Sequence, residues 1–182
     1  VLFRSLLGGK GANLAEMTRL GLPVPPGFTI TTQACREYLV AGSEPGPLRV
    51  EVTMALRRLE DTLGKRLGDV HDPLLVSVRS GAKFSMPGMM ETVLNIGLND
   101  YSVNGLIEAS GNPRFAWDSY RRLVQMFGKT VLDIEGEVFA NALHNKLTQR
   151  GLTSEVDMNA DDLRDLVEVF KTIVREIGRA HV

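Results

Sequence analysis

The stretch that decides the fold lies at residues 74–79 and reads Leu-Leu-Val-Ser-Val-Arg. It is a short apolar run rich in β-branched residues, with Pro73 directly before it, as is typical of a buried strand. A helical pattern comes before this strand, with one apolar face formed by Leu48, Val52, Leu56, Leu59 and Leu63. Because helices and strands alternate here, we expect a mixed α/β architecture in this half of the chain.

The first thirty residues contain a glycine cluster, Gly8-Gly9-Lys10-Gly11, followed by apolar residues at helical spacing. We expect a loop that leads into a short helix, which ends at Gly21 because prolines follow. Residues 27–31 alternate as a short strand would. Thr31 or Thr32 can then cap a second helix that runs through Leu39.

The character of the sequence changes after about residue 98. Helical patterns follow one another, and the second has a strong apolar face. The expected helices cover residues 103–109, 114–127, 137–150 and 160–175. The apolar face of the second comprises Phe115, Tyr120, Leu123, Val124 and Phe127. Asn159 and Asp162 make an approximate cap for the last helix. We therefore expect an α/β lobe over residues 6–98 and an all-helical subdomain over residues 99–176.

Both ends of the sequence are unusual. Residues 1–5 begin without Met and join abruptly to the glycine cluster, and residues 177–182 stop a helical pattern midway. Both strings resemble translated adapter DNA, so we expect them to be non-native and exclude them from the fold. The alternative is that they are ordinary termini.

Composition excludes several classes of function. The net charge is −1, and the lysines and arginines are spread along the sequence without a basic tract, so nucleic-acid binding is not indicated. The sequence has no apolar run of about 18 residues, the length that a membrane span needs. The single Cys35 cannot form an internal disulfide, which favours a reducing compartment such as the cytoplasm. We expect the Cys35 side chain to be buried in its helix. The three histidines share no metal-ligand spacing, and no metal site is expected.

The glycine cluster could bind an anion. Glycines let backbone N–H groups approach closely, a helix N-terminus adds positive potential, and Lys10 supplies a charge suited to phosphate. The spacing is not that of a P-loop, and no Ser or Thr follows the lysine. From the residues alone, a flexible surface turn with an exposed lysine remains the alternative.

Two further stretches could contribute to a site. Arg79 ends the apolar strand, where α/β proteins commonly bind ligands, and its planar guanidinium suits phosphate. The alternative is an edge arginine paired with an acid. Residues 85–92 read Ser-Met-Pro-Gly-Met-Met-Glu-Thr, and such a loop could either cover a nucleotide or pack as core filler.

Together these stretches resemble the start of pyruvate phosphate dikinase. The similar segments are residues 7–17, 26–32, 72–82 and 85–95, extended by residues 111–116 and 120–122. The resemblance covers nearly everything between residues 6 and 176. Lys83-Phe84 and Glu91 depart from the family's usual residues, which affects loop detail only.

The resemblance implies part of an ATP-grasp lobe followed by the helical subdomain. It implies that Lys10 and Arg79 bind ATP phosphates and that the loop at residues 85–92 covers them. The residues implied at the nucleotide are Gly8, Gly9, Lys10, Gly11, Arg79, Met86, Gly88, Met89 and Thr92. The Mg²⁺ ligands are implied to lie outside this sequence, as are the phosphohistidine and the site for pyruvate or phosphoenolpyruvate.

The family enzyme interconverts ATP, pyruvate and phosphate with AMP, phosphoenolpyruvate and pyrophosphate, and it is expected to be a homodimer. By itself this sequence is expected to be inactive. Two alternatives remain: a phosphoenolpyruvate synthase-like ATP-binding domain, whose loop is more acidic, and a non-catalytic helical interaction module.

Overall fold

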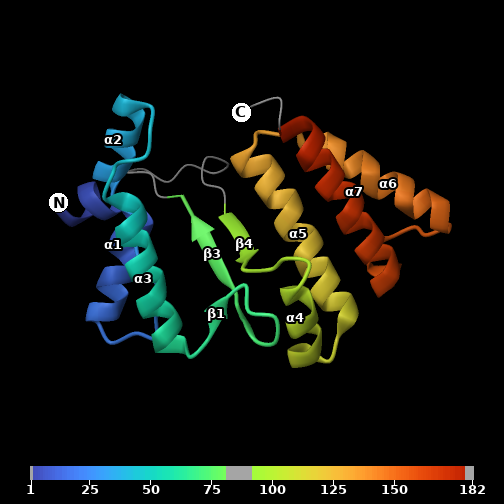
Figure 1. Cartoon of the computed structure of the whole chain (residues 1–182), viewed down its shortest axis with the longest axis horizontal. Helices are drawn as coiled ribbons and strands as arrows, with labels where there is room; N and C mark the ends of the chain where they lie inside the picture. The colour runs from blue at the N-terminus through green and yellow to red at the C-terminus, as the bar shows by residue number, and fades with distance from the viewer. Residues whose placement is uncertain (1, 81–91, 179–182) are drawn as a thin grey trace. The chain divides into compact units, whose positions relative to one another are not determined.

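The computed structural model describes residues 2–80 and 92–178. Within these ranges the chain is mostly helical, with two small two-stranded sheets (Figure 1). It divides into two compact units, one of Val1–Lys65 with Arg79–Glu91 and the other of Arg66–Val78 with Thr92–Val182. The second unit thus includes residues 66–78 and 92–98, which the sequence analysis assigned to the first lobe.

Three helices form most of the first unit: α1 (Leu2–Arg19), α2 (Thr32–Ala41) and α3 (Leu48–Leu63). Thr31 is the N-cap of α2, and its side chain accepts a hydrogen bond from the Ala34 N–H at 3.4 Å. Gly64 ends α3 with a φ of 66°, a left-handed conformation that glycine adopts without strain. The helices expected after Thr31 and from Leu48 are therefore confirmed.

Two expectations for this unit are wrong. Residues 27–31 form no strand, because no strand in the described ranges pairs with this extended segment. Cys35 is exposed on α2 and is not buried. Helix α2 has no buried residue, so the apolar residues of α2, Cys35 included, do not belong to a core.

The first unit leaves many apolar side chains in solvent. Leu59 on α3 is buried, with 8% of its surface exposed, whereas Leu39 and Val40 on α2 are 73% and 90% exposed. Helix α1 packs against α2. The described residues thus cover only a small part of the apolar surface of this unit.

The two sheets are short. Strand β1 (Arg66–Leu67) pairs in parallel with β2 (Pro73–Leu74), and β3 (Val76–Arg79) pairs with β4 (Thr92–Ile96). The strand expected over residues 74–79 is therefore divided between two sheets. Gly97 has a φ of 119° and lies so close to the Leu74 carbonyl that no Cβ would fit there. Glycine at this position allows the chain to turn directly after β4.

The second unit contains α4 (Ser102–Ser110), α5 (Pro113–Val131), α6 (Gly136–Arg150), the short 3₁₀ helix η1 (Glu155–Asp157) and α7 (Ala160–Gly178). Helix α7 packs against both α5 and α6, and Figure 1 shows the three side by side. None of the helices in the described ranges combines the length and apolar character needed to cross a bilayer.

The core of the second unit lies between these helices. Its fully buried members include Val103, Phe139, Leu163, Val167 and Phe170. The rings of Phe139 on α6 and Phe170 on α7 meet edge to face, with centroids 5.0 Å apart. Such aromatic pairs stabilise a fold beyond their burial alone.

Several residues at the margin of this core test the sequence-based expectations. The Asn159 side chain accepts a hydrogen bond from the Asp162 N–H at 2.9 Å, as the sequence indicated. Phe115 and Phe127 on α5, expected on its apolar face, remain 49% and 40% exposed. Ile177, in the segment expected to be non-native, packs against the core.

Candidate functional site

The glycine cluster forms a kink in α1. Gly8 has a φ of 69° and a ψ of 176°, so the helix consists of two helical stretches that meet at this residue. Glycine adopts a positive φ without the penalty that a Cβ brings. Gly8 is buried, and Gly9, Lys10 and Gly11 follow in the first turn of the second stretch. The expected loop is thus reduced to a kink, but a helix does begin directly after it.

Lys10 projects from that first turn and is partly exposed. The nearest acid in the sequence after it, Glu16, is already paired with Arg19 at 2.6 Å. The hydrogen bond from Arg19 lowers the pKa of Glu16. Among the described residues no carboxylate pairs with Lys10. Its charge therefore has no internal partner in the described part of the chain.

Arg79 ends β3, as the sequence predicted, and its side chain is exposed. No acid pairs with it within residues 2–80 and 92–178. The alternative reading, an edge arginine held by a nearby acid, therefore has no support in the described ranges.

Thr92 is half-buried and begins β4, the strand that pairs with β3. Arg79 and Thr92 consequently border the intervening segment from its two ends. Met86, Gly88 and Met89 lie outside the described residues, so their part in the site stays a prediction.

A contact that the sequence did not reveal holds the glycine cluster. A Cβ built on Gly11 would lie 3.2 Å from both Cγ2 and Oγ1 of Thr29 and 3.1 Å from the Leu7 Cβ. The Thr32 hydroxyl donates a hydrogen bond to the main-chain carbonyl of Ser5. Only the short spacing between the two motifs could have suggested such contacts.

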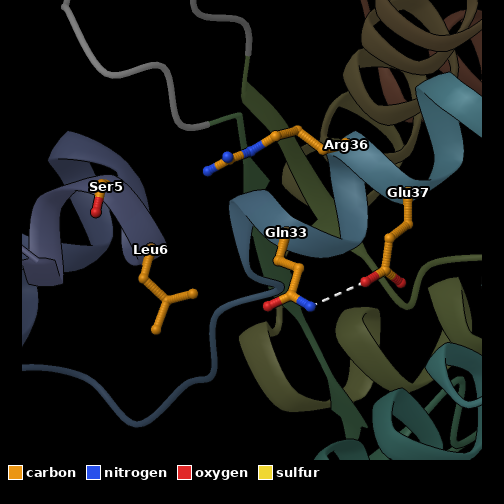
Figure 2. A pocket seen from close by; sticks show the side chains of 5 residues that line it. All are labelled: Ser5, Leu6, Gln33, Arg36 and Glu37. Atoms are coloured by element: carbon orange, nitrogen blue, oxygen red, sulfur yellow. Dashed lines mark hydrogen bonds between the residues drawn. The ribbon is translucent and has the colours of Figure 1, made fainter.

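Two surface depressions lie in the first unit, apart from the expected site residues. The larger has a volume of about 300 Å³ and is lined by Ser5, Leu6, Gln33, Arg36 and Glu37 (Figure 2). The other, of about 270 Å³, lies between Phe28 and the second half of α3. In the first, Gln33 donates a hydrogen bond to Glu37 at 3.0 Å. Neither depression is lined by a residue that the sequence predicted for the site.

The described residues offer no metal centre. No three His, Cys, Asp or Glu side chains within them lie close enough together to hold an ion. Residues of these ranges therefore do not fit a magnesium site on their own.

A family model described as "Pyruvate phosphate dikinase, AMP/ATP-binding domain" matches residues 4–44. This range contains the kink at Gly8, Lys10 and the Thr29–Thr32 segment. The similarity extends well beyond it. Over 174 residues the chain is 49% identical to the pyruvate, phosphate dikinase of Clostridium symbiosum. The aligned region is 95% of this chain and 20% of that protein.

The chain matches a segment of pyruvate phosphate dikinase. The resemblance to this family, which the sequence motifs predicted, is thereby confirmed. The pyruvate, phosphate dikinase of Giardia intestinalis is 52% identical over 172 residues, which are 94% of this chain and 20% of that protein. Pyruvate, phosphate dikinase 2 of Zea mays is 51% identical over 174 residues, 95% of this chain and 20% of that protein. The chain thus spans about a fifth of the length of the curated relatives that it matches.

Proposed function

We propose that this chain binds the phosphates of ATP through Lys10 and Arg79, as part of the ATP-grasp nucleotide site of a pyruvate phosphate dikinase. One observation carries the proposal: these two cations have no carboxylate partner among the described residues. Several other cations of the chain are paired, as Arg121 is with Asp118. An unpaired lysine or arginine suits a phosphate, because the phosphate then supplies the missing negative charge.

The glycine kink supports the same site. Gly8, Gly9 and Gly11 keep side chains away from the start of the helical stretch that carries Lys10. In the proposed site, backbone N–H groups of this turn approach the phosphates and the helix N-terminus adds positive potential. Met86, Gly88 and Met89, between β3 and β4, and Thr92, which begins β4, are proposed to cover the nucleotide.

In the proposed whole enzyme, a phosphoryl group passes from ATP to a histidine and then to pyruvate. Inorganic phosphate is consumed, and AMP, pyrophosphate and phosphoenolpyruvate are formed. Mg²⁺ would neutralise charge on the phosphates, with ligands that lie outside this sequence. A homodimer and a cytoplasmic location complete the proposal, although some relatives carry the word "chloroplastic" in their names.

The test uses a full-length chimaera in which this sequence replaces the matching segment of the Clostridium symbiosum relative. ATP-side exchange, which forms AMP, and pyruvate-side exchange, which forms phosphoenolpyruvate, are measured separately. Lys10→Ala and Arg79→Ala should each weaken ATP use by roughly tenfold to a hundredfold, because hydrogen bonds to charged groups contribute roughly 1.5–3 kcal/mol. Pyruvate-side exchange should stay unchanged, since those residues lie elsewhere in the proposal.

Arg19→Ala is the matched control, because it removes a cation from the same helix that is paired with Glu16. It should leave ATP use unchanged. Equal loss in both exchanges, or no loss of ATP use in either variant, would show that the site is misassigned. Failure of any nucleotide to bind the chimaera would instead favour the helical interaction module. A chimaera that forms phosphoenolpyruvate from ATP without inorganic phosphate would favour the synthase-like alternative.

A further inference from the structure

The segment that follows the proline-rich stretch has no role in the function proposed above. Residues 27–31 form neither helix nor strand in the described ranges, and Thr32 begins α2. A segment without backbone pairing is held in place by its side chains, and three threonines stand at or directly after it, Thr29, Thr31 and Thr32. Thr31 caps α2, which accounts for one of them.

Thr29 packs against Gly11, inside the glycine cluster. A methyl group at Gly11 would lie 3.2 Å from Thr29 Cγ2, 3.2 Å from Thr29 Oγ1 and 3.1 Å from Leu7 Cβ. Carbon atoms normally approach no closer than about 3.5 Å. The missing side chain of Gly11 is therefore what allows Thr29 to lie against the helical turn that carries Lys10.

Thr32 holds the other side of the kink. Its hydroxyl donates to the carbonyl of Ser5, three residues before Gly8, while Thr29 contacts Gly11, three residues after it. The acceptor is a main-chain atom, so the contact does not depend on which side chain stands at position 5. Thr29 and the first residue of α2, three positions apart, thus contact both helical stretches that meet at Gly8.

We propose that Thr29 is a positioning residue for nucleotide binding, and that Gly11 acts through its missing side chain by letting Thr29 fix the turn of Lys10. This rests on the proposed function of Lys10. The direction in which a lysine projects follows the helix that carries it. A shift of that turn therefore moves the ammonium group away from the phosphate and weakens ATP binding without touching the ligand.

Gly11→Ala tests this contact in the full-length chimaera. It should raise KM for ATP by about tenfold, because overpacking at this contact displaces Thr29 and the turn. Gly27→Ala is the matched control: a Cβ there meets no atom within 4 Å, and the residue belongs to the same segment. It should leave KM unchanged.

Removing the opposing side chain should relieve the clash. The double variant Gly11→Ala/Thr29→Ala should bind ATP better than Gly11→Ala alone, and this coupling is the signature of a direct contact. Thr29→Ala alone opens space and cannot clash, and it should raise KM for ATP by about threefold, since the turn loses its support. None of these variants should change pyruvate-side exchange.

Several results would overturn the proposal. The first is an equal KM for ATP in Gly11→Ala and Gly27→Ala. The second is a double variant that binds ATP no better than Gly11→Ala. The third is a Gly11→Ala protein that loses both exchanges equally and has a lower thermal midpoint. The last result would assign the contact to stability alone. If Lys10→Ala has no effect, the proposed function fails. If Lys10→Ala is impaired and Gly11→Ala is not, only this inference fails.

Discussion

Lys171 on α7 donates a hydrogen bond to Oδ1 of Asp100 at 2.6 Å, across 71 positions of sequence. The Tyr120 hydroxyl on α5 donates to the same oxygen at 2.9 Å. Lys171 also pairs with Glu168 at 2.8 Å. A single carboxylate before α4 thus links three parts of the second unit.

Asp100→Asn should destabilise the second unit by about 1 kcal/mol. This is less than the roughly 1.5–3 kcal/mol of a hydrogen bond to a charged group, because the Asp100 side chain is 54% exposed and its ion pair is screened by solvent. Asp161→Asn is the control, since Asp161 is 76% exposed and, among the described residues, pairs only with Arg164 on its own helix. Urea unfolding of both variants measures the difference. Equal midpoints would show that the link does not stabilise the unit.

The same cluster should make stability fall at acid pH. The hydrogen bond from Lys171, followed by that from Tyr120, lowers the pKa of Asp100. Because the folded-state pKa lies below the unfolded value of about 3.9, the stabilisation is complete above that pH and is lost as pH falls through the folded-state pKa. Unfolding free energies measured between about pH 5 and 2.5 should therefore fall less in Asp100→Asn than in the parent. Parallel curves would contradict this.

Stability should also fall at alkaline pH. Burial, and then the hydrogen bond to Asp100, raises the pKa of the Tyr120 hydroxyl. A raised folded-state pKa gives a stabilisation that is complete below the unfolded value of about 10 and is lost as pH rises beyond it. Burial alone would lower the pKa of Lys171, but its hydrogen bonds to Asp100 and Glu168 outweigh this and raise it, so it acts in the same direction. Tyr120→Phe should flatten the curve above about pH 10, and an unchanged slope would contradict the assignment.

Two neighbouring arginines on α5 should differ sharply in their effect on stability. The Arg121 side chain is 4% exposed and that of Arg122 is 57% exposed, yet both pair with Asp118, at 2.7 and 2.8 Å. Arg121→Ala should cost about 3 kcal/mol, because it also removes buried packing and the contact with Glu155. Arg122→Ala should cost less than about 1 kcal/mol, as exposed pairs do. Chemical denaturation compares them, and similar costs would contradict the role of burial.

Gly128→Ala should destabilise the contact between α5, α6 and α7. A Cβ there would lie 2.6 Å from Phe139 Cζ and 3.3 Å from Val174 Cγ2, so the Phe139 ring must move, at a cost of about 1–3 kcal/mol. Gly136→Ala is the control, because its Cβ would meet only the flexible end of Lys129. Thermal unfolding should separate the two variants. A stable Gly128→Ala protein would mean that the core is loosely packed.

Helices were predicted well because their signals are local. The apolar spacing from Leu48 gave α3, and the capping pair Asn159 and Asp162 gave the start of α7. Strands depend on distant partners, and this explains the errors. Residues 27–31 alternate correctly but have no pairing strand among the described residues, while β4 was not predicted at all.

Burial was harder to predict than helix position. On α5, Ala116, Tyr120, Leu123 and Val124 recur at helical spacing and are buried, whereas Phe115 and Phe127 flank that face. Which flank is covered depends on the angle at which α7 packs, and a sequence pattern does not give that angle. At the candidate site, residue types and order were predicted. The contact between Gly11 and Thr29 depends on close approach in space and was not.

The kink at Gly8 also sets a requirement of handedness. Reversing the signs of its φ and ψ gives an extended conformation that ordinary L residues adopt easily. In its stereochemistry, this one position therefore suits a D residue. A chain assembled by chemical ligation with D-alanine at position 8 would meet the backbone preference, whereas L-alanine would oppose it. Among the genetically encoded residues, the achiral one is the natural solution here.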